Sequence, residues 1–350
     1  MNLLITGGTG FIGSHTCLLL IAQGYDLVIY DSFINSSAKV LDRLGIILKI
    51  NNDYLFKRIT LIRGDIRDKK KLIELFSFFE SKGKSINGVL HFAGLKSVSD
   101  SVINPLEYWD VNLSGTKNLL QVMNQFNCKI FVFSSSATIY APKLNGYINE
   151  EHEINPMNPY GRTKAAVEYL LADLYSSDNT WSIASLRYFN PVGAHHSGMI
   201  GEDPFGIPNN LFPFISQVAA GRLDKLKIYG SNWPTFDGTG VRDYVHVIDL
   251  ADGHICALNY LLNNKVRNFI KLNLGSGKGY SVLEVINTYS NVIGRSIPYE
   301  IVDRRLGDNA FSVADPSLAK DILGWETKKL LIDMCKDSWN WQKNNPQGYS

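Results

Sequence analysis

Near its start the chain reads Leu3-Leu4-Ile5-Thr6-Gly7-Gly8-Thr9-Gly10-Phe11-Ile12-Gly13, an apolar run that passes through spaced glycines into a helical pattern. Glycines at this spacing suit three tasks in a strand–turn–helix unit. Gly7 allows the tight turn, Gly10 lets the backbone approach a pyrophosphate, and Gly13 lets the helix pack close to the strand. The N–H groups of Phe11 and Ile12, at the start of the helix, then face the phosphates. The pattern predicts a dinucleotide site.

A second apolar run ends in Asp31, about 20 residues beyond the glycines. A carboxylate at this place accepts hydrogen bonds from both adenosine ribose hydroxyls and repels a 2′-phosphate, so it favours NAD over NADP. Asp65 and Ile66 follow the third run and are predicted adenine contacts. The fourth run leads into Phe92-Ala93-Gly94, where we expect a second close approach to the cofactor.

Apolar runs alternate with helical patterns through the first half of the chain. The runs cover residues 3–6, 26–30, 59–63, 88–92 and 130–133. This rhythm predicts an α/β fold with a Rossmann-type, doubly wound parallel sheet, in which ligands collect at the carboxyl ends of the strands.

We expect residues 1–188 to form an NAD-binding domain and residues 189–350 a smaller α/β lobe for the substrate, with part of 240–275 packing back on the first domain. The smaller lobe is predicted to contain short helices at 212–221 and 282–293 and strand-like pieces at 227–229 and 271–274.

Tyr160 and Lys164 stand four residues apart, so a helix places them on one face, one turn apart. A tyrosine with its ordinary pKa of about 10 is a poor base at neutral pH until something stabilises its anion. We expect the Lys164 ammonium to do so. The serines Ser134-Ser135-Ser136 follow the fifth apolar run, and the sequence leaves open which of them faces a substrate.

Composition excludes several other classes of protein. With 350 residues, 45% hydrophobic and 19% charged, and a net charge of +2, the chain has no basic field suited to nucleic acid or an anionic membrane. Its four cysteines stand far apart and indicate neither a disulfide framework nor a zinc site. No metal is expected at His195-His196 either, since adjacent side chains point apart and no partner ligand stands at usable spacing. Without a signal-like leader or a membrane-spanning apolar run, we expect a cytoplasmic protein.

These features together resemble the extended branch of the short-chain dehydrogenase/reductase superfamily, in which a serine or threonine, a tyrosine and a lysine act as a unit. The resemblance implies that Ser136 holds the reacting oxygen and that Tyr160 takes and returns its proton. It also implies that Lys164 binds the nicotinamide ribose while lowering the pKa of the tyrosine. Asn112 stands where the superfamily often has a supporting asparagine.

Longer motifs in the second half are similar to those of UDP-glucose (UDP-galactose) 4-epimerases, and this resemblance covers essentially the whole chain. The motifs are Arg187-Tyr188-Phe189-Asn190-Pro191-Val192-Gly193-Ala194-His195, Gly206-Ile207-Pro208-Asn209-Asn210-Leu211-Phe212-Pro213, Asp237-Gly238-Thr239-Gly240-Val241-Arg242-Asp243-Tyr244-Val245-His246 and Arg304-Arg305-Leu306-Gly307-Asp308.

The family resemblance implies a tightly bound NAD and a UDP-sugar substrate. The residues implied for NAD are Gly7, Gly10, Phe11, Ile12, Gly13, Asp31, Asn35, Asp65, Ile66, Phe92, Ala93, Gly94, Lys96, Asn112, Ser134, Tyr160 and Lys164. The residues implied for the substrate are Lys96, Ser136, Tyr160, Asn190, Asn210, Leu211, Tyr229, Arg242, Arg305, Asp308 and Ser312. Among these, Arg242 and Arg305 are expected to clamp the diphosphate, and Asp308 to take the uridine ribose hydroxyls.

The implied reaction inverts carbon 4 of the sugar through a transient 4-keto intermediate, so NAD is regenerated in each cycle. One alternative is a nucleotide-sugar 4,6-dehydratase, but these enzymes carry an Asp-Glu pair beside the catalytic serine or threonine, where this chain has Ala137-Thr138-Ile139. Another alternative is a non-catalytic NAD-binding sensor or scaffold, which has little need for Ser136, Tyr160 and Lys164 together.

Two finer expectations also come from the family. The position four residues after the uridine-binding Asp lines the sugar pocket, where a tyrosine suits plain hexoses and a small residue leaves room for a 2-acetamido group. Counting from Asp308 gives Ser312, which implies action on UDP-GlcNAc and UDP-GalNAc as well as on UDP-Glc and UDP-Gal, with Phe311 as the alternative wall. The family also implies a homodimer through helices at about 105–125 and 160–175.

Overall fold

The computed structural model describes residues 1–143, 145–206, 208, 210–264, 268–304 and 308–349. Its larger part is built on a seven-stranded sheet in the order β10-β6-β5-β4-β1-β2-β3, with every pair parallel. The strand order reverses beside β1, which is where ligands bind in folds of this type. The strands are β1 (Asn2–Thr6), β2 (Asp26–Asp31), β3 (Ile59–Arg63), β4 (Ile86–His91), β5 (Ile130–Ser136), β6 (Ser182–Tyr188) and β10 (Phe269–Leu274).

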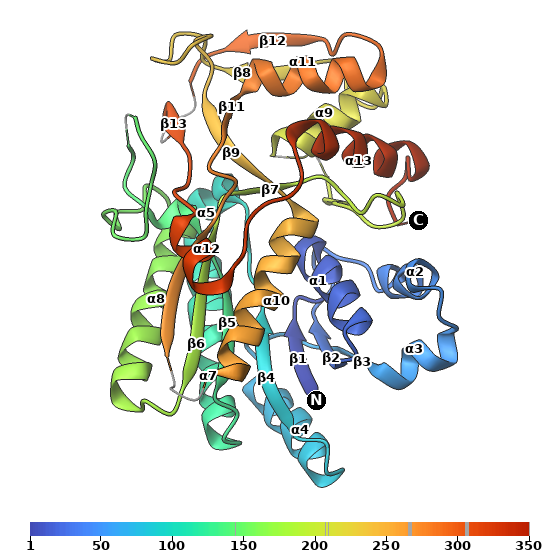
Figure 1. Ribbon diagram of the computed structural model, residues 1–350, viewed down its shortest axis with the longest axis vertical. Coiled ribbons are helices and arrows are strands. Elements are labelled where there is room, and N and C mark those ends of the chain that lie inside the picture. Colours follow the sequence, from blue (N-terminus) through green and yellow to red (C-terminus); the bar gives the residue numbers. More distant parts are fainter. Residues whose placement is uncertain (144, 207, 209, 265–267, 305–307, 350) are drawn as a thin grey trace.

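Helices cover both faces of this sheet (Figure 1). One apolar core lies under α1 (Phe11–Ala22), α2 (Lys39–Leu48), α3 (Asn52–Arg58) and α10 (Val247–Asn263). The other lies under α4 (Lys69–Ser81), α7 (Thr116–Gln125) and α8 (Pro159–Ser177). Because both faces are covered, the central strands are continuously apolar, and Leu3, Leu4 and Ile5 of β1 have no exposed surface.

A smaller lobe lies above the carboxyl ends of these strands (Figure 1). It holds a four-stranded sheet of β7 (Asn190–Val192), β9 (Val241–His246), β11 (Gly279–Ser281) and β13 (Phe311–Ser312). A two-stranded sheet pairs β8 (Leu226–Tyr229) with β12 (Tyr299–Val302). The helices of this lobe are α9 (Leu211–Ala219), α11 (Val282–Ile293) and α13 (Leu331–Asn344).

The chain passes between the two parts more than once. After β9 it returns as α10, which packs on α1, and then as β10, which pairs with β6 at the edge of the large sheet. The piece at 271–274, grouped above with the smaller lobe, therefore belongs to the large sheet, and it lies within 240–275, part of which was expected to pack back on the first domain. After β13 the chain returns once more as α12 (Ser317–Leu323), which packs against β10 before α13 begins.

Ahead of α7 the chain forms α5 (Val98–Ile103), α6 (Pro105–Tyr108) and a π-helix, η1 (Trp109–Gly115). A π-helix carries one extra residue per turn and is often found at functional sites. In the part of the chain that the structure describes, no helix combines the length and the apolar character needed to cross a bilayer.

Candidate active site

The glycine turn between β1 and α1 is packed as tightly as the sequence predicts. Gly7 has φ +70°, and a Cβ atom on it would lie 2.7 Å from the backbone nitrogen of Ala93. A Cβ on Gly13 would lie 2.3 Å from the carbonyl oxygen of Gly7, so only glycine allows this contact between helix and turn. A Cβ on Gly10, at the start of α1, would meet no described atom closer than the Gly7 oxygen at 3.3 Å. The turn thus leaves open backbone at the helix start, which fits a dinucleotide phosphate.

Asp31 lies at the end of β2 with its side chain turned into the glycine turn. Its Oδ2 accepts a hydrogen bond from the Thr9 N–H at 3.0 Å, and its Oδ1 accepts from the Phe33 N–H and the Ser36 hydroxyl, both at 2.9 Å. A carboxylate offers about four lone-pair positions, so these three bonds orient it and leave room for a further donor. A ribose hydroxyl would fit this remaining position.

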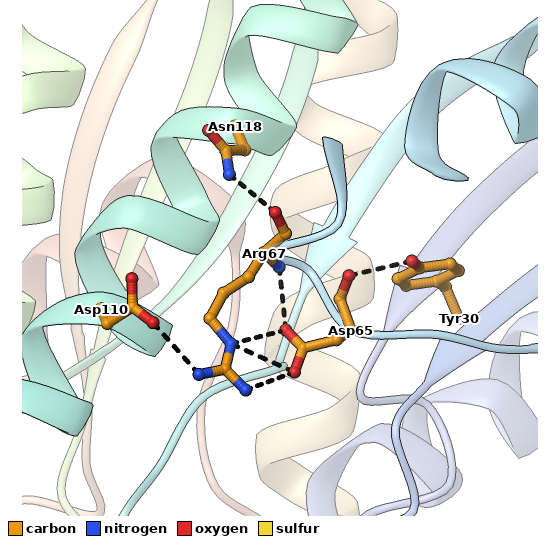
Figure 2. A network of polar contacts seen from close by, with 5 residues as sticks. All are labelled: Tyr30, Asp65, Arg67, Asp110 and Asn118. Atoms are coloured by element: carbon orange, nitrogen blue, oxygen red, sulfur yellow. Dashed lines mark hydrogen bonds and ion pairs between the residues drawn. The ribbon is translucent and has the colours of Figure 1, made fainter. Parts of the chain in front are cut away.

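Asp65 lies at the neighbouring strand end and is held by Arg67 (Figure 2). The Arg67 Nη2 lies 2.7 Å from Asp65 Oδ2, while its Nη1 lies 3.1 Å from Asp110 of η1. The Arg67 guanidinium lowers the pKa of Asp65, so this carboxyl stays charged at neutral pH. The Ile66 side chain is buried in the core, so an adenine contact at this residue would use its backbone.

The loop after β4 is pinned by Asn112, which η1 presents to it. The Asn112 Oδ1 accepts from the Leu95 N–H at 2.8 Å, and its Nδ2 donates to the Leu95 carbonyl at 3.1 Å and to Thr163 Oγ1 at 3.0 Å. A Cβ on Gly94 would lie 3.0 Å from this Oδ1. One buried amide therefore fixes the predicted cofactor loop 92–96 against helix α8.

The three serines of β5 have different partners, which settles how they are oriented. The Ser134 hydroxyl lies 2.8 Å from His254 Nε2, and the Ser135 hydroxyl donates to Glu168 Oε1 at 2.6 Å. The Ser136 hydroxyl accepts from Thr138 Oγ1 at 2.9 Å, a neighbour on the loop that follows. Ser134 and Ser135 are thus tied to side chains of α10 and α8, whereas the role of Ser136 toward a substrate stays a prediction.

Tyr160 lies in the first turn of α8, where Asn158 caps the helix and Pro159 opens it. Burial raises the pKa of Tyr160 above its usual range, while hydrogen bonding to Ser136 and Tyr188 lowers it. The partly positive helix start also favours the phenolate. Ser136 and Tyr188 are register partners on β5 and β6, so the phenol lies over the junction of the two strands.

Lys164 lies one turn from Tyr160 on α8, and its ammonium is bonded to β5. Its Nζ donates to the Ser134 carbonyl at 2.8 Å and lies 5.9 Å from the centre of the Tyr160 ring. In this structure Ser136 and Tyr188 are the groups that lower the pKa of the phenol. A role for Lys164 toward the ribose and the phenolate stays a prediction.

Two other predicted cofactor ligands contact a segment of the smaller lobe. Lys96 Nζ lies 2.7 Å from Glu202 Oε1, and Asn35 Oδ1 accepts from the Phe205 N–H at 3.2 Å. The same segment is anchored near the C-terminus, because Trp341 Nε1 donates to the Glu202 carbonyl at 3.0 Å. Residues 202–205 therefore bridge from the smaller lobe to two loops at the carboxyl edge of the sheet.

The predicted substrate residues of the smaller lobe gather around β9. Arg242 Nη2 lies 3.3 Å from Asp308 Oδ1, and Ser312 is the register partner of Arg242 in β13. Register partners on parallel strands share a face, so Ser312 lies beside these charged side chains. Asn190 on β7 donates to the Asp243 carbonyl at 2.9 Å, which ties it to the same sheet.

The other predicted substrate residues lie at element ends. Asn210 caps α9, whose first residue is Leu211, and Tyr229 ends β8. Arg305 lies outside the described residues.

His195 and His196 depart from the sequence-based expectation. Their ring centres lie 4.2 Å apart with an angle of 37° between the ring planes, so the rings face each other rather than pointing apart. Ser197 closes the turn that follows His195, with its hydroxyl oxygen 2.8 Å from His195 Nδ1. Burial lowers the pKa of His195 to about 4, so this imidazole is neutral at physiological pH. Within the described residues, no three His, Cys, Asp or Glu side chains are grouped to hold a metal ion.

Sequence reasoning missed the buried ion pair between Glu168 of α8 and Arg187 of β6. Arg187 Nη2 lies 2.6 Å from Glu168 Oε2, and both side chains are almost fully buried. Two signals point to the pair. An arginine interrupts an otherwise apolar strand, and a glutamate follows Lys164 by one helical turn.

Comparison with known proteins gives a consistent picture. A family model described as GDP-mannose 4,6 dehydratase matches residues 4–338. The chain is 48% identical to a UDP-glucose 4-epimerase of Bacillus subtilis over 349 residues, which cover 100% of this chain and 99% of that protein.

Solved structures are similar over their whole length. A UDP-glucose-4-epimerase from Stenotrophomonas maltophila, with bound NAD and formylated UDP-arabinopyranose, superposes with a TM-score of 0.92 at 47% identity and 99% coverage of both chains. The UDP-Glc/GlcNAc 4-epimerase of Campylobacter jejuni superposes with a TM-score of 0.81 at 31% identity, covering 98% of this chain and 99% of that one.

Proposed function

This chain belongs to the UDP-glucose 4-epimerase family, within the extended short-chain dehydrogenase/reductase superfamily, and on that premise we infer how its own residues carry out NAD-dependent 4-epimerisation of UDP-hexoses. The observation that carries the inference is the junction of β5 and β6. There Ser136 and Tyr160 meet, and Lys164 lies one helical turn further along α8. Catalytic groups at the carboxyl ends of parallel strands suit a substrate held beneath the smaller lobe.

Tyr160 is the acid–base group in this proposal. Its phenolate removes the proton from the 4-hydroxyl of the sugar, and the phenol later returns a proton to the same oxygen. Ser136 donates a hydrogen bond to that oxygen and so fixes its position. The chemistry that NAD supplies when bound is the reversible oxidation of carbon 4.

The glycine turn, Asp31 and Asp65 would hold the adenosine end of NAD, while Lys164 would hold the nicotinamide ribose. Arg242 and Asp308 would hold the UDP part of the substrate at the opposite side. Anchoring at UDP lets the hexose turn over while the rest of the substrate stays bound, and this turn is what exposes the other face of carbon 4.

The family model bears a dehydratase description, but the residues beside Ser136 favour epimerisation. Elimination of water requires an acid and a base next to the sugar, and Ala137-Thr138-Ile139 supplies neither. Thr138 instead donates its hydroxyl to Ser136 at 2.9 Å and so orients that side chain.

We propose in addition that the sugar pocket accepts 2-acetamido sugars. Ser312 lies beside Arg242 in the small sheet, so it shares a face with a predicted diphosphate ligand. A serine leaves space that a tyrosine would fill, and a pocket excludes substrates chiefly by such bulk. The likeness to an epimerase of UDP-Glc and UDP-GlcNAc supports this width. Phe311 packs toward Gly279 of β11, which argues against it as the wall.

We further propose that the protein is a homodimer joined through α5, α6 and α8. Large apolar side chains on these helices face solvent: Val102 is 62%, Ile103 75%, Leu106 82% and Tyr169 58% exposed. Exposed apolar side chains gathered in this way are typical of a protein interface. A four-helix bundle formed by two copies would cover them.

The function is tested by incubating the purified protein, without added cofactor, with each of UDP-Glc, UDP-Gal, UDP-GlcNAc and UDP-GalNAc, and by resolving the products. Each sugar should be converted into its 4-epimer. Tyr160→Phe, which retains the ring but not the hydroxyl, should retain bound NAD and lose about 10²–10⁴-fold in kcat. A 4-keto-6-deoxy product would indicate a dehydratase, and undiminished activity of Tyr160→Phe would remove this tyrosine from the mechanism.

A further inference from the structure

A pair of opposite charges lies buried beneath the proposed catalytic residues. Arg187 Nη2 lies 2.6 Å from Glu168 Oε2, and Arg187 Nε lies 3.1 Å from each carboxylate oxygen. The side chains are 1% and 4% exposed. Removing two charges from water is costly and gives little net stability, so such a pair calls for an explanation beyond packing.

The pair is attached to the elements that carry the active site. Glu168 stands one helical turn beyond Lys164 on α8, and its Oε1 accepts the Ser135 hydroxyl at 2.6 Å. Arg187 is the register partner of Ser135 on the adjacent strand. Its Nη1 donates to the Glu150 carbonyl at 2.8 Å, which fixes the guanidinium from the other side.

Lys164 is the side chain that most needs this negative charge. It is 5% exposed, and its ammonium donates to the carbonyl of Ser134, which carries no net charge to balance it. Burial lowers the pKa of Lys164 to about 8, and the charge of Glu168 opposes that change. The Glu168 carboxylate accepts from the Ser135 hydroxyl, and the Lys164 ammonium donates to the carbonyl of the preceding residue, Ser134, so both side chains reach the same short stretch of β5.

We propose that Glu168, held in place by Arg187, keeps the Lys164 side chain protonated and oriented for the reaction, and is thus a positioning residue of the active site. This inference rests on the proposed function, because it concerns the lysine of the proposed catalytic unit. The arrangement is a row of three charges, Lys164–Glu168–Arg187, in which the central carboxylate serves both cations.

The other titratable groups around this row do not change charge near neutral pH. On β4, burial lowers the pKa of His91 to about 3, with the Lys164 charge acting in the same direction. Burial raises the pKa of Tyr140 beyond its usual range, and the same cause raises that of Tyr188. Arg187 stays charged, since its partner raises its pKa against the effect of burial. Within the described surroundings, Lys164 and Tyr160 remain as the groups whose titration affects the reaction.

The sign of the expected effect follows from these charges. Lys164 must be protonated to act, so activity falls as pH rises through the pKa of Lys164, and this gives the alkaline limb of the pH profile. Removing the negative charge of Glu168 lowers that pKa and moves the alkaline limb to lower pH.

The test compares wild type, Glu168→Gln, Glu168→Asp and the control Asp173→Asn, with kcat for UDP-galactose measured across the pH range. Asp173 lies on the same helix with an exposed side chain, so Asp173→Asn also removes one negative charge, but one that is exposed to solvent. In Glu168→Gln the alkaline limb should move down by at least about one pH unit, which lowers kcat on that limb about tenfold. In Glu168→Asp and Asp173→Asn it should stay in place.

An unmoved limb in folded, active Glu168→Gln would overturn the proposal, and so would an equal shift in Glu168→Asp, since that would indicate a packing effect. If Glu168→Gln does not fold because Arg187 is left unpaired, the double variant Glu168→Gln/Arg187→Met removes both buried charges and should show a shift in the same direction but smaller, because loss of the Arg187 cation partly offsets loss of the carboxylate; an unmoved limb there would overturn the proposal. A wild-type protein without epimerase activity would instead contradict the proposed function, so the two failures are distinct.

Discussion

Ser312 shows how one small side chain can set the range of substrates. It is the register partner of Arg242, and Arg242 in turn is paired with Asp308, so the serine belongs to the group of residues predicted to receive the nucleotide sugar. Its hydroxymethyl group occupies little of the space beside them. In our proposal the range of substrates depends on the absence of bulk at Ser312 rather than on a new contact.

Ser312→Tyr should therefore exclude acetamido sugars and spare plain hexoses. We expect kcat/KM for UDP-GlcNAc to fall by about 100-fold while that for UDP-Glc changes little, because added bulk discriminates by steric exclusion. The measurement is the ratio of the two kcat/KM values. Phe311→Leu serves as the matched control, since Phe311 points toward β11, and it should leave the ratio unchanged. A parallel fall for both sugars in Ser312→Tyr would place the wall elsewhere.

At single positions, the sequence predicts the local structure well where only one residue type can fit. Gly7 and Gly13 are examples, because the backbone geometry and close contacts there allow no other residue. It could not rank the three serines of β5, since both faces of the sheet are covered and only the partners, His254 for Ser134 and Glu168 for Ser135, distinguish the hydroxyls. It also could not show that the Lys164 ammonium donates to the Ser134 carbonyl, because helix and strand are brought together only by the fold.

At the scale of elements, η1 is the piece that the active site depends on most. The extra residue in its π-turn brings Asn112 to the loop after β4, where the amide bonds to both backbone groups of Leu95 and to Thr163 of α8. A regular helix over the same residues would carry Asn112 to a different position around the axis. The π-helix thus lets one side chain, Asn112, hold the loop after β4 and helix α8 in fixed positions relative to each other.

Asn112→Ala should lower both stability and turnover. It leaves three buried polar groups without their partner, which costs about 1–3 kcal/mol in the free energy of unfolding, and it frees the loop that carries Lys96. Urea denaturation and kcat measure the two effects. The control is Asn118→Ala, whose side chain donates one exposed bond to the Arg67 carbonyl and should change stability by less than about 0.5 kcal/mol (Figure 2). Equal effects of the two variants would argue against a special role for η1.

The sequence predicted the elements of the first half well because buried parallel strands and helices have distinct periodicities. It did not predict η1, since a single extra residue barely alters a helical pattern. It predicted that part of 240–275 would pack back on the first domain but did not identify β6 as the partner of 271–274, because β10 pairs with β6 across a long stretch of intervening chain. Local pattern identifies a strand but not its neighbour.

At the scale of the whole molecule, the exposed apolar side chains of α5, α6 and α8 predict assembly. Leu106→Glu places a charge at the most exposed of the described apolar positions in this set, and it should convert the dimer into single chains. Sedimentation equilibrium measures the mass. Phe236→Glu, at a fully exposed position in the other lobe, should leave the mass unchanged. A wild-type mass of one chain would contradict the homodimer directly.

The pairing of β6 with β10 also affects the order in which the large sheet can form during synthesis of the chain. The ribosome completes β6 at Tyr188, yet its partner begins only at Phe269, about 80 residues later. At typical synthesis rates of 5–20 residues per second, the edge of β6 waits for about 4–16 s with its backbone N–H and C=O groups unpaired. A nascent chain ending near residue 188 therefore exposes the edge of this seven-residue strand until β10 has been made.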